Sequence, residues 1–391
     1  MQSKKGTPKM NLQQKKDNSF LATEPLGRLL LKLSLPTVTA QVINMLYNIV
    51  DRIYIGHIPE TGALALTGVG VCMPLIMIVS AFAALVGNGG APRASIFMGK
   101  GDKESAEQTL GNCFTTQIVV SLLLTLILFT GNKSFLMAFG ASENTIPYAV
   151  AYMNIYSLGT IFVQLTLGMN AFITAQGFAK TSMLSVLVGA ASNIILDPIF
   201  IFALHMGVRG AALATIVSQA LSCTWVLHFL MGKKSYLKIH RCNMKLKKDI
   251  ILPSLALGLS TFIMQSSESV ISVCFNSSLL KYGGDIAVGA MTILTSVMQF
   301  AMLPLQGLGQ GAQPIISYNY GAKLTGRVRS AYKLLLALSL SYASLLWLGV
   351  MLAPQAFAAM FTSDPALIDF TKHALRIYMD CMFLFGIQMA C

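Results

Sequence analysis

An amide and an acid lie one helical turn apart within an apolar part of the sequence. Asn193 and Asp197 fall inside residues 183–204, a run that is long enough to cross a bilayer. On a helix the two side chains share one face and can hold the same ion or proton. Pro198 follows them and has no N–H group, so the carbonyl of Ile194 is left unpaired and a kink is favoured.

A carboxylate at membrane depth needs a reason, because it costs roughly 2.5–3.5 kcal/mol on insertion scales. Asp197, its neighbouring amide and the freed carbonyl therefore predict an ion or proton site. The alternative is a structural aspartate that is hydrogen-bonded beside a proline kink.

Polar side chains also form stripes on other apolar segments. One stripe runs along residues 41–51 and ends at Asp51, next to Arg52. Its alternatives are helix–helix hydrogen bonds for the amides and an outer interface position for Asp51. Such stripes on five segments predict a wet central cavity rather than a dry bundle. Their members are Gln41, Asn44, Tyr47, Asn48, Asp51, Thr160, Gln164, Asn170, Thr174, Thr215, Gln219, Gln265, Glu268, Ser272, Asn276, Gln299, Gln306, Gln310 and Gln313.

The composition excludes a soluble globular enzyme. Apolar residues make up 54% of the chain and charged residues only 11%, which predicts an all-α polytopic membrane protein. The net charge of +13 comes from connecting segments. This distribution indicates contacts with anionic lipid and a fixed membrane orientation rather than binding of nucleic acid. The seven cysteines have no paired spacing and predict no metal or disulfide framework. No P-loop motif is present, so ATP-driven transport would need a nucleotide-binding domain from another protein.

The hydropathy pattern predicts ten spans. Most lysines and arginines fall on one side of this arrangement, which predicts a cytoplasmic N-terminus. The spans are residues 33–54, 65–87, 112–131, 147–172, 183–204, 210–231, 250–275, 286–308, 331–353 and 374–391.

An internal repeat predicts two lobes. Residues 89–92 and Gly99 recur as residues 311–314 and Gly321, and residues 33–41 match residues 257–265 at nearly the same offset. The predicted parts are a cytoplasmic tail (1–27), a six-helix lobe (28–232), a basic cytoplasmic loop between the lobes (233–249) and an incomplete second lobe (250–391). Compared with the first lobe, the second lacks two spans, giving four of an expected six helices around the central cavity.

These motifs resemble those of multidrug and toxic compound extrusion (MATE) transporters, and most of all the bacterial DinF-type branch. The resemblance runs from about Gly27 to the end of the chain. Its members have twelve helices in two lobes and exchange protons or sodium ions for cationic or amphipathic drugs. The motifs that carry it are Leu35-Pro36, Asn48-Ile49-Val50-Asp51-Arg52-Ile53-Tyr54-Ile55-Gly56, residues 87–92, Asn193-Ile194-Ile195-Leu196-Asp197-Pro198, Gly210-Ala211-Ala212 and residues 311–321.

The resemblance implies two sets of binding residues. In the first lobe, Asp51 and Asp197 would bind the proton or a sodium ion, and no other metal is expected. Their partners would be Asn193, Tyr47, Thr215 and Asn170. A second-lobe site would contain Glu268 and Gln306. In another branch that site has a second acid, which should fall near Phe385. This chain has Asp380 one turn earlier instead, which puts a second-lobe sodium site in doubt.

The implied function is that of a secondary active multidrug exporter, not an enzyme, which works by alternating access. It would need no cofactor besides its coupling ion, with proton and sodium both open. Its partners would be the lipid bilayer and small cationic or amphipathic drugs, not nucleic acid. We expect a monomer with multiple spans in the bacterial cytoplasmic (inner) membrane. The alternatives are a truncated paralogue without transport activity and a lipid-linked oligosaccharide flippase, although a flippase would favour a cationic cavity.

Overall fold

The computed structural model describes residues 19–359 and 365–390, apart from the side chains of most residues between 269 and 292 and of residue 366. Every regular element in these residues is helical, and seven helices are long and apolar enough to cross a membrane, or eight with one bent pair. The predicted all-α polytopic architecture is therefore confirmed. The elements are α1 (Phe20–Thr23), α2 (Leu26–Gly56), α3 (Gly62–Lys100), α4 (Lys103–Ala138), α5 (Ile146–Leu158), α6 (Thr160–Ala175), α7 (Ala179–Pro198), the π-helix η1 (Ile199–Ala203), α8 (Val208–Met231), the 3-10 helix η2 (Arg241–Met244), α9 (Lys248–Gly321), α10 (Thr325–Leu352), α11 (Pro354–Ala359), α12 (Pro365–Tyr378) and α13 (Met382–Ala390).

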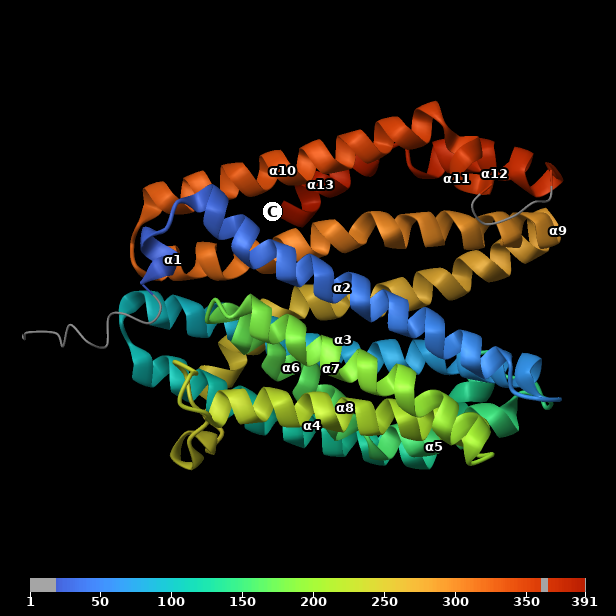
Figure 1. Cartoon of the computed structure of the whole chain (residues 1–391), viewed down its shortest axis with the longest axis horizontal. Coiled ribbons are helices and arrows are strands. Elements are labelled where there is room, and N and C mark those ends of the chain that lie inside the picture. The colour runs from blue at the N-terminus through green and yellow to red at the C-terminus, as the bar shows by residue number, and fades with distance from the viewer. Residues whose placement is uncertain (1–18, 360–364, 391) are drawn as a thin grey trace, which may run out of the picture.

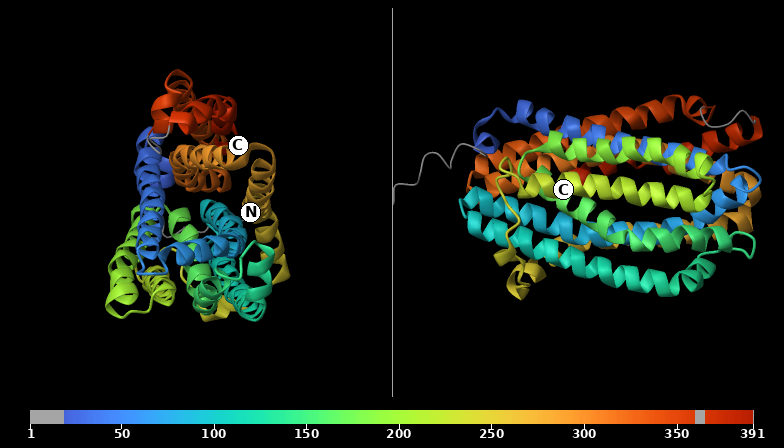
Figure 2. Two further views of the ribbon diagram at one scale, coloured as in Figure 1. Left: turned by 90° about the vertical axis from the view of Figure 1, so that its right-hand side faces the viewer. Right: turned by 60° about the horizontal axis from the view of Figure 1, so that its bottom comes forward.

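The long helices run lengthwise through the molecule and form two groups (Figure 1). Helices α3–α8 lie together on one side and α10–α13 on the other, with α2 and α9 between them. The end-on view in Figure 2 shows the same division. The boundaries predicted for the lobes stay a prediction.

Local sequence signals set the sharp turn between α3 and α4. Gly101, at the end of α3, has a φ of +78°, a left-handed conformation that glycine adopts without strain. Asp102 then caps α4, because its side chain accepts a hydrogen bond from the backbone N–H of Ser105 at 3.0 Å. These two residues end one long helix and start the next without an intervening loop.

Two of the predicted spans are not single helices. Residues 147–172 are divided into α5 and α6, which meet at Gly159 with a bend of 57°. A Cβ at Gly159 would overlap the side chain of Ile216, so the bend occurs where α8 packs closely against a residue that has no side chain. Residues 374–391 are divided between α12 and α13. The breaks at both places were not predicted.

The predicted seventh and eighth spans belong to one helical element, α9, of 74 residues. A straight helix of that length would extend about 110 Å. Instead, α9 turns back on itself (Figure 1). As a result, residues from both of its ends contact the same helix, α3. Gly258 lies against the backbone of Leu85, and Gly321 lies against the backbone of Ile96.

The two copies of the predicted repeat contact each other through glycines. A Cβ at Gly99 would fall on the carbonyl oxygen of Tyr318, and a Cβ at Gly321 would fall on that of Ile96. Since Gly99 corresponds to Gly321 in the repeat, and Ile96 to Tyr318, the two contacts are equivalent. They bring α3 and the end of α9 to backbone contact, which leaves no room for a side chain at either glycine.

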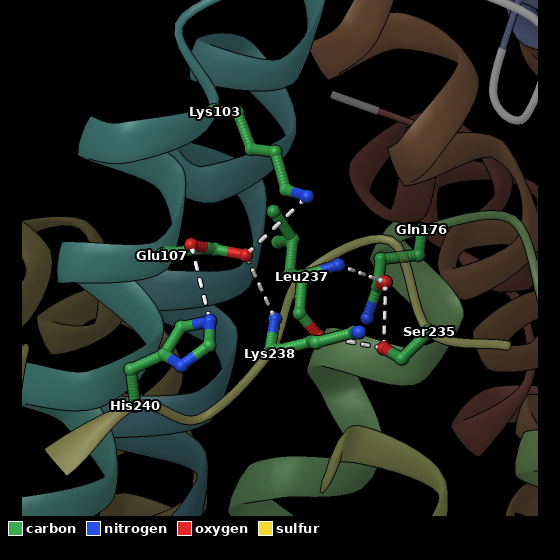
Figure 3. A network of polar contacts seen from close by, with 7 residues as sticks. All are labelled: Lys103, Glu107, Gln176, Ser235, Leu237, Lys238 and His240. Atoms are coloured by element: carbon green, nitrogen blue, oxygen red, sulfur yellow. Dashed lines mark hydrogen bonds and ion pairs between the residues drawn. The ribbon is translucent and has the colours of Figure 1, made fainter. Parts of the chain in front are cut away.

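The segment that joins the two groups is fixed to the first of them (Figure 3). The Gln176 side-chain oxygen accepts hydrogen bonds from the Ser235 hydroxyl (3.0 Å) and the Leu237 backbone N–H (2.9 Å). The Glu107 carboxylate accepts one from the backbone N–H of Lys238 at 3.2 Å and lies 3.7 Å from His240 Nε2. The segment is therefore held along α4 and α6.

The end of the predicted N-terminal tail is folded. Residues 1–18 lie outside the described residues, but the short helix α1 packs into the bundle. The side chain of Leu21 is fully buried, and its carbonyl accepts hydrogen bonds from Asn319 Nδ2 (2.9 Å) and Arg327 Nη2 (3.3 Å). Residues 19–27 therefore belong to the folded part, which the polar composition of the whole segment did not predict.

We expect Gly99→Ala and Gly321→Ala to destabilise the protein by similar amounts. Each added methyl group would press on a backbone carbonyl across the contact, and such overpacking costs about 1–3 kcal/mol. Thermal unfolding of the purified protein measures the effect. Gly70→Ala is the control, because Gly70 lies in α3 with open space around it. Unchanged stability of both variants would contradict this contact.

We also expect Gln176→Ala to release the connecting segment. Ser235 and Leu237 would lose their shared acceptor, at about 1–3 kcal/mol, which raises the opened fraction about 5- to 150-fold. The measurement is the rate of tryptic cleavage at Lys233 and Lys234. Gln108→Ala serves as control, since Gln108 reaches this segment only through the Lys247 ammonium at 3.4 Å. Equal cleavage rates in both variants would exclude the role assigned to Gln176.

Candidate functional site

Two carboxyl groups from different helices face each other near one end of the first group. Asp51 of α2 and Asp197 of α7 lie close enough for their side chains to form a hydrogen bond. Asn193 Nδ2 donates a hydrogen bond to Asp197 Oδ1 at 3.1 Å, and Asp197 is completely buried. The structure therefore brings together the two predicted acids and the predicted amide.

The local form of α7 follows from its sequence. Asn193 and Asp197 lie one turn apart and share a face, as their spacing predicted. At Pro198 the α-helix ends, and the chain continues as one π-helical turn over Ile199–Ala203. Proline cannot donate to the carbonyl of Ile194, so the regular ladder is interrupted directly after the acid.

Three further side chains surround the acid pair. Tyr47, one turn before Asp51 on α2, is near enough to interact electrostatically with both acids. Tyr152 of α5 lies near both Asp51 and the Thr215 side chain. Tyr47 and Thr215 were predicted, but Tyr152 was not. Its only signal was its spacing from Tyr156, on which it stacks at a centroid distance of 6.1 Å, and buried aromatic residues of this kind usually indicate core packing.

The structure does not bring Asn170 to the acid pair. Its Oδ1 accepts a hydrogen bond from the Ser185 hydroxyl at 3.1 Å, and its Nδ2 donates to the Ser182 carbonyl at 3.5 Å. Both serines are in the first half of α7, whereas Asp197 is at its end. Because each residue adds about 1.5 Å along a helix, three turns separate Ser185 from Asp197. Asn170 therefore belongs to a different polar cluster.

A small cavity lies beside the acids, between α2, α6, α7 and α8. Its volume is about 40 Å³. The polar residues around it include Asn44, Tyr47, Asn193, Thr215, Ser218 and Gln219. Two of the four helices, α2 and α8, contribute polar side chains that were predicted to form inward stripes, so part of the predicted polar interior is located here.

Several oxygen atoms at the acid pair are buried and have no hydrogen-bond partner. They are Asp51 Oδ1, Asn193 Oδ1 and Asp197 Oδ2. Two facing carboxylates repel each other strongly in a poorly polarisable interior, so both cannot carry a full charge without compensation. A proton or a small cation would supply it, and oxygen ligands suit hard cations. The described residues contain no cluster of three or more His, Cys, Asp or Glu that could hold a metal ion.

The structure does not assemble the second predicted site. Glu268 is exposed, and Tyr378 is the one ionisable group near enough to interact with it among those described. Gln306 is half-buried, and no hydrogen bond joins it to Glu268 within the described side chains. Asp380 is exposed as well. These residues therefore offer no enclosed carboxylate pair comparable with Asp51 and Asp197.

Comparisons with known proteins agree with this fold. The model of the MatE family matches residues 36–199 and 260–391. The multidrug export protein MepA of Staphylococcus haemolyticus (strain JCSC1435) is 26% identical over 368 residues, which are 94% of this chain and 80% of that protein. A crystal structure of MATE in the bent conformation has a TM-score of 0.88 at 23% identity and covers 96% of this chain and 82% of that one. An outward-facing multidrug resistance MATE family transporter has a TM-score of 0.87 at 24% identity, with 96% and 83% covered.

Proposed function

Since the chain belongs to the MatE family, we propose that it is a secondary active multidrug exporter that exchanges a coupling ion for cationic or amphipathic drugs. The name of its relative MepA, a multidrug export protein, supports this function. The apolar helices support a location in the bilayer, which we propose to be the bacterial inner membrane, with the protein as a monomer and its N-terminus in the cytoplasm.

The observation that carries the proposal is the buried pair of Asp51 and Asp197. When a proton or cation is bound, the pair can be neutralised and stable in the interior. When the ion leaves, the acid pair becomes negatively charged. It then favours a conformation in which this charge is compensated again. We propose that this difference couples ion movement to alternating access, and that a cationic drug is exported in the complementary half of the cycle.

We propose the proton as the coupling ion, because two carboxyl groups at hydrogen-bonding distance are suited to share one. Sodium is the second candidate, since the three unpartnered atoms are all oxygens. The acid pair in the first lobe also supports membership of the DinF-like branch. It argues against a lipid-linked oligosaccharide flippase, whose anionic substrate would favour basic residues in the cavity.

We expect Asp197→Asn and Asp51→Asn each to reduce ion-driven efflux by about tenfold or more without preventing membrane insertion. An amide can accept hydrogen bonds but cannot bind or release the proton. The measurement is ethidium transport in proteoliposomes that are energised either by a pH gradient or by a sodium gradient. Glu268→Gln is the matched control and should have a smaller effect, because Glu268 is exposed.

Efflux like that of the wild type in both aspartate variants, at equal protein levels, would refute the acid pair as the coupling site. Loss of efflux in Glu268→Gln that equals the loss in Asp197→Asn would instead assign coupling to the second group of helices. Transport that responds only to the sodium gradient would replace the proton by sodium in the proposal.

The proposed orientation has its own test. A reporter fused after Lys248 should lie in the cytoplasm, and one fused after Gly140, between α4 and α5, should lie outside. Alkaline phosphatase and green fluorescent protein fusions give opposite signals on the two sides. The reverse pattern at either position would contradict the orientation.

A further inference from the structure

The short helix α1 lies where the two groups of helices meet, at the end of the molecule where α9 is followed by α10 (Figure 1). Leu21 of α1 is completely buried there, in an apolar cluster that also contains Ala179 at the start of α7 and Leu335 of α10. Those two helices belong to different groups. A terminal helix that only covered one group would share a cluster with that group alone, so α1 bridges the two.

The contact of α1 with the first group is made through Phe20. A Cβ at Gly177, in the turn between α6 and α7, would press into the ring of Phe20, so the ring lies directly on the glycine. Gly177 has a φ of +87°, a conformation that favours glycine. The Lys32 ammonium lies 4.9 Å from the centroid of the same ring, and it forms an ion pair with Glu24 at 2.8 Å. These neighbours hold the ring in place over the turn.

The contact of α1 with α9 and α10 consists of hydrogen bonds. Pro25 has no N–H group, so the carbonyl of Leu21 lacks the donor that a longer helix would provide four residues later. Asn319 Nδ2 of α9 and Arg327 Nη2 of α10 donate to this carbonyl instead, at 2.9 Å and 3.3 Å. Arg327 Nη2 also donates to the carbonyl of Glu24 at 2.8 Å. Two helices therefore fasten the backbone of α1.

The two contacts differ in what their separation would break. If α1 left α9 and α10, the buried carbonyl of Leu21 would lose its donors, and an unpaired buried polar group is costly. Among the described residues, no hydrogen bond joins α1 to α6 or α7. Phe20 can therefore leave Gly177 without leaving a polar group unpaired, and this contact separates more easily than the other.

We propose that α1 is a latch that keeps this end of the bundle closed, and that the end opens when Phe20 leaves Gly177. The inference rests on the proposed function, because it requires a protein that works by alternating access and has this end in the cytoplasm. The backbone contacts of Gly99 and Gly321 lie at the same end. Opening therefore requires both the latch and the contact between α3 and α9 to separate.

Opening of this end can be followed at Ser95. Its side chain is completely buried, and its hydroxyl donates to the Pro314 carbonyl at 3.5 Å, across the contact between α3 and α9. Ser95→Cys changes one atom and provides a thiol that a maleimide reaches only when this contact separates. Trypsin cuts after Arg93 and Lys100, so mass spectrometry of residues 94–100 distinguishes this label from labels on the native cysteines.

The test is Phe20→Ala in the Ser95→Cys protein. We expect the labelling rate of residue 95 to rise by about tenfold or more, because only the closed state buries the ring on Gly177. Arg327→Gln should also raise the rate, since it weakens the contact of the latch with the other group.

Phe178→Ala is the matched control. Phe178 follows Gly177 in the same turn, but its ring packs on Phe229 of α8 at a centroid distance of 5.2 Å, within the first group. The variant therefore removes a ring of equal size without touching the latch. We expect it to lower the thermal stability as Phe20→Ala does, while the labelling rate of residue 95 stays near that of the parent protein.

Two results would overturn the latch. One is a labelling rate in folded Phe20→Ala that equals the parent rate. The other is an equal rise in Phe178→Ala, which would assign the effect to a general loosening of the bundle. If Phe20→Ala does not fold, Arg327→Gln decides by the same two criteria.

The parent Ser95→Cys protein distinguishes failure of the latch from failure of the proposed function. In proteoliposomes, alternating access predicts that its labelling rate changes with ethidium or with a pH or sodium gradient. If the rate responds to none of them, alternating access is wrong and the latch falls with it. If the rate responds and Phe20→Ala leaves it unchanged, only the latch is overturned.

Discussion

The central constraint in this protein is the placement of two carboxyl groups face to face in an apolar helical bundle. Asp51 and Asp197 come from helices far apart in the chain, and the interior around them cannot screen their repulsion. The neighbouring features can be understood from this constraint. Asn193 donates to one acid, and tyrosines approach from two helices. The regular α-helix ends directly after the acid, at Pro198, and continues as a π-helical turn.

A second constraint acts between the two groups of helices. Glycines at equivalent positions of the repeat meet the opposite backbone, so α3 and α9 approach as closely as two helices can. This contact is at the end of α3 that is distant from the acid pair. A change in the angle between the groups would therefore have to alter either these contacts or the shape of α9.

The sequence predicted the parts of the site that lie on a single helix. Asn193 and Asp197 share a face by spacing alone, and the proline after them predicted the interruption of α7. The prediction of Asp51 depended on a polar stripe on another helix and on the family resemblance. Tyr152 could not be predicted, because only tertiary packing, including that of α5 against α8, brings it to the acids. The position of Asn170 likewise depends on tertiary structure, because the short turn between α6 and α7 places it beside Ser182 and Ser185, away from Asp197.

The fixed connection between the groups has a mechanical consequence. The segment after α8 is fastened to α4 and α6 up to Lys247, whose backbone N–H donates to Asn112 Oδ1 at 2.7 Å. Directly afterwards, Arg93 donates to the carbonyls of Asp249 (3.3 Å) and Ile250 (2.7 Å). The connecting segment is therefore held in place along its length and does not act as a flexible linker. If one group of helices moves relative to the other, either the backbone near Lys248 must rotate or the hydrogen bonds of Arg93 must break. The length of the segment therefore does not determine how far the two groups can move apart.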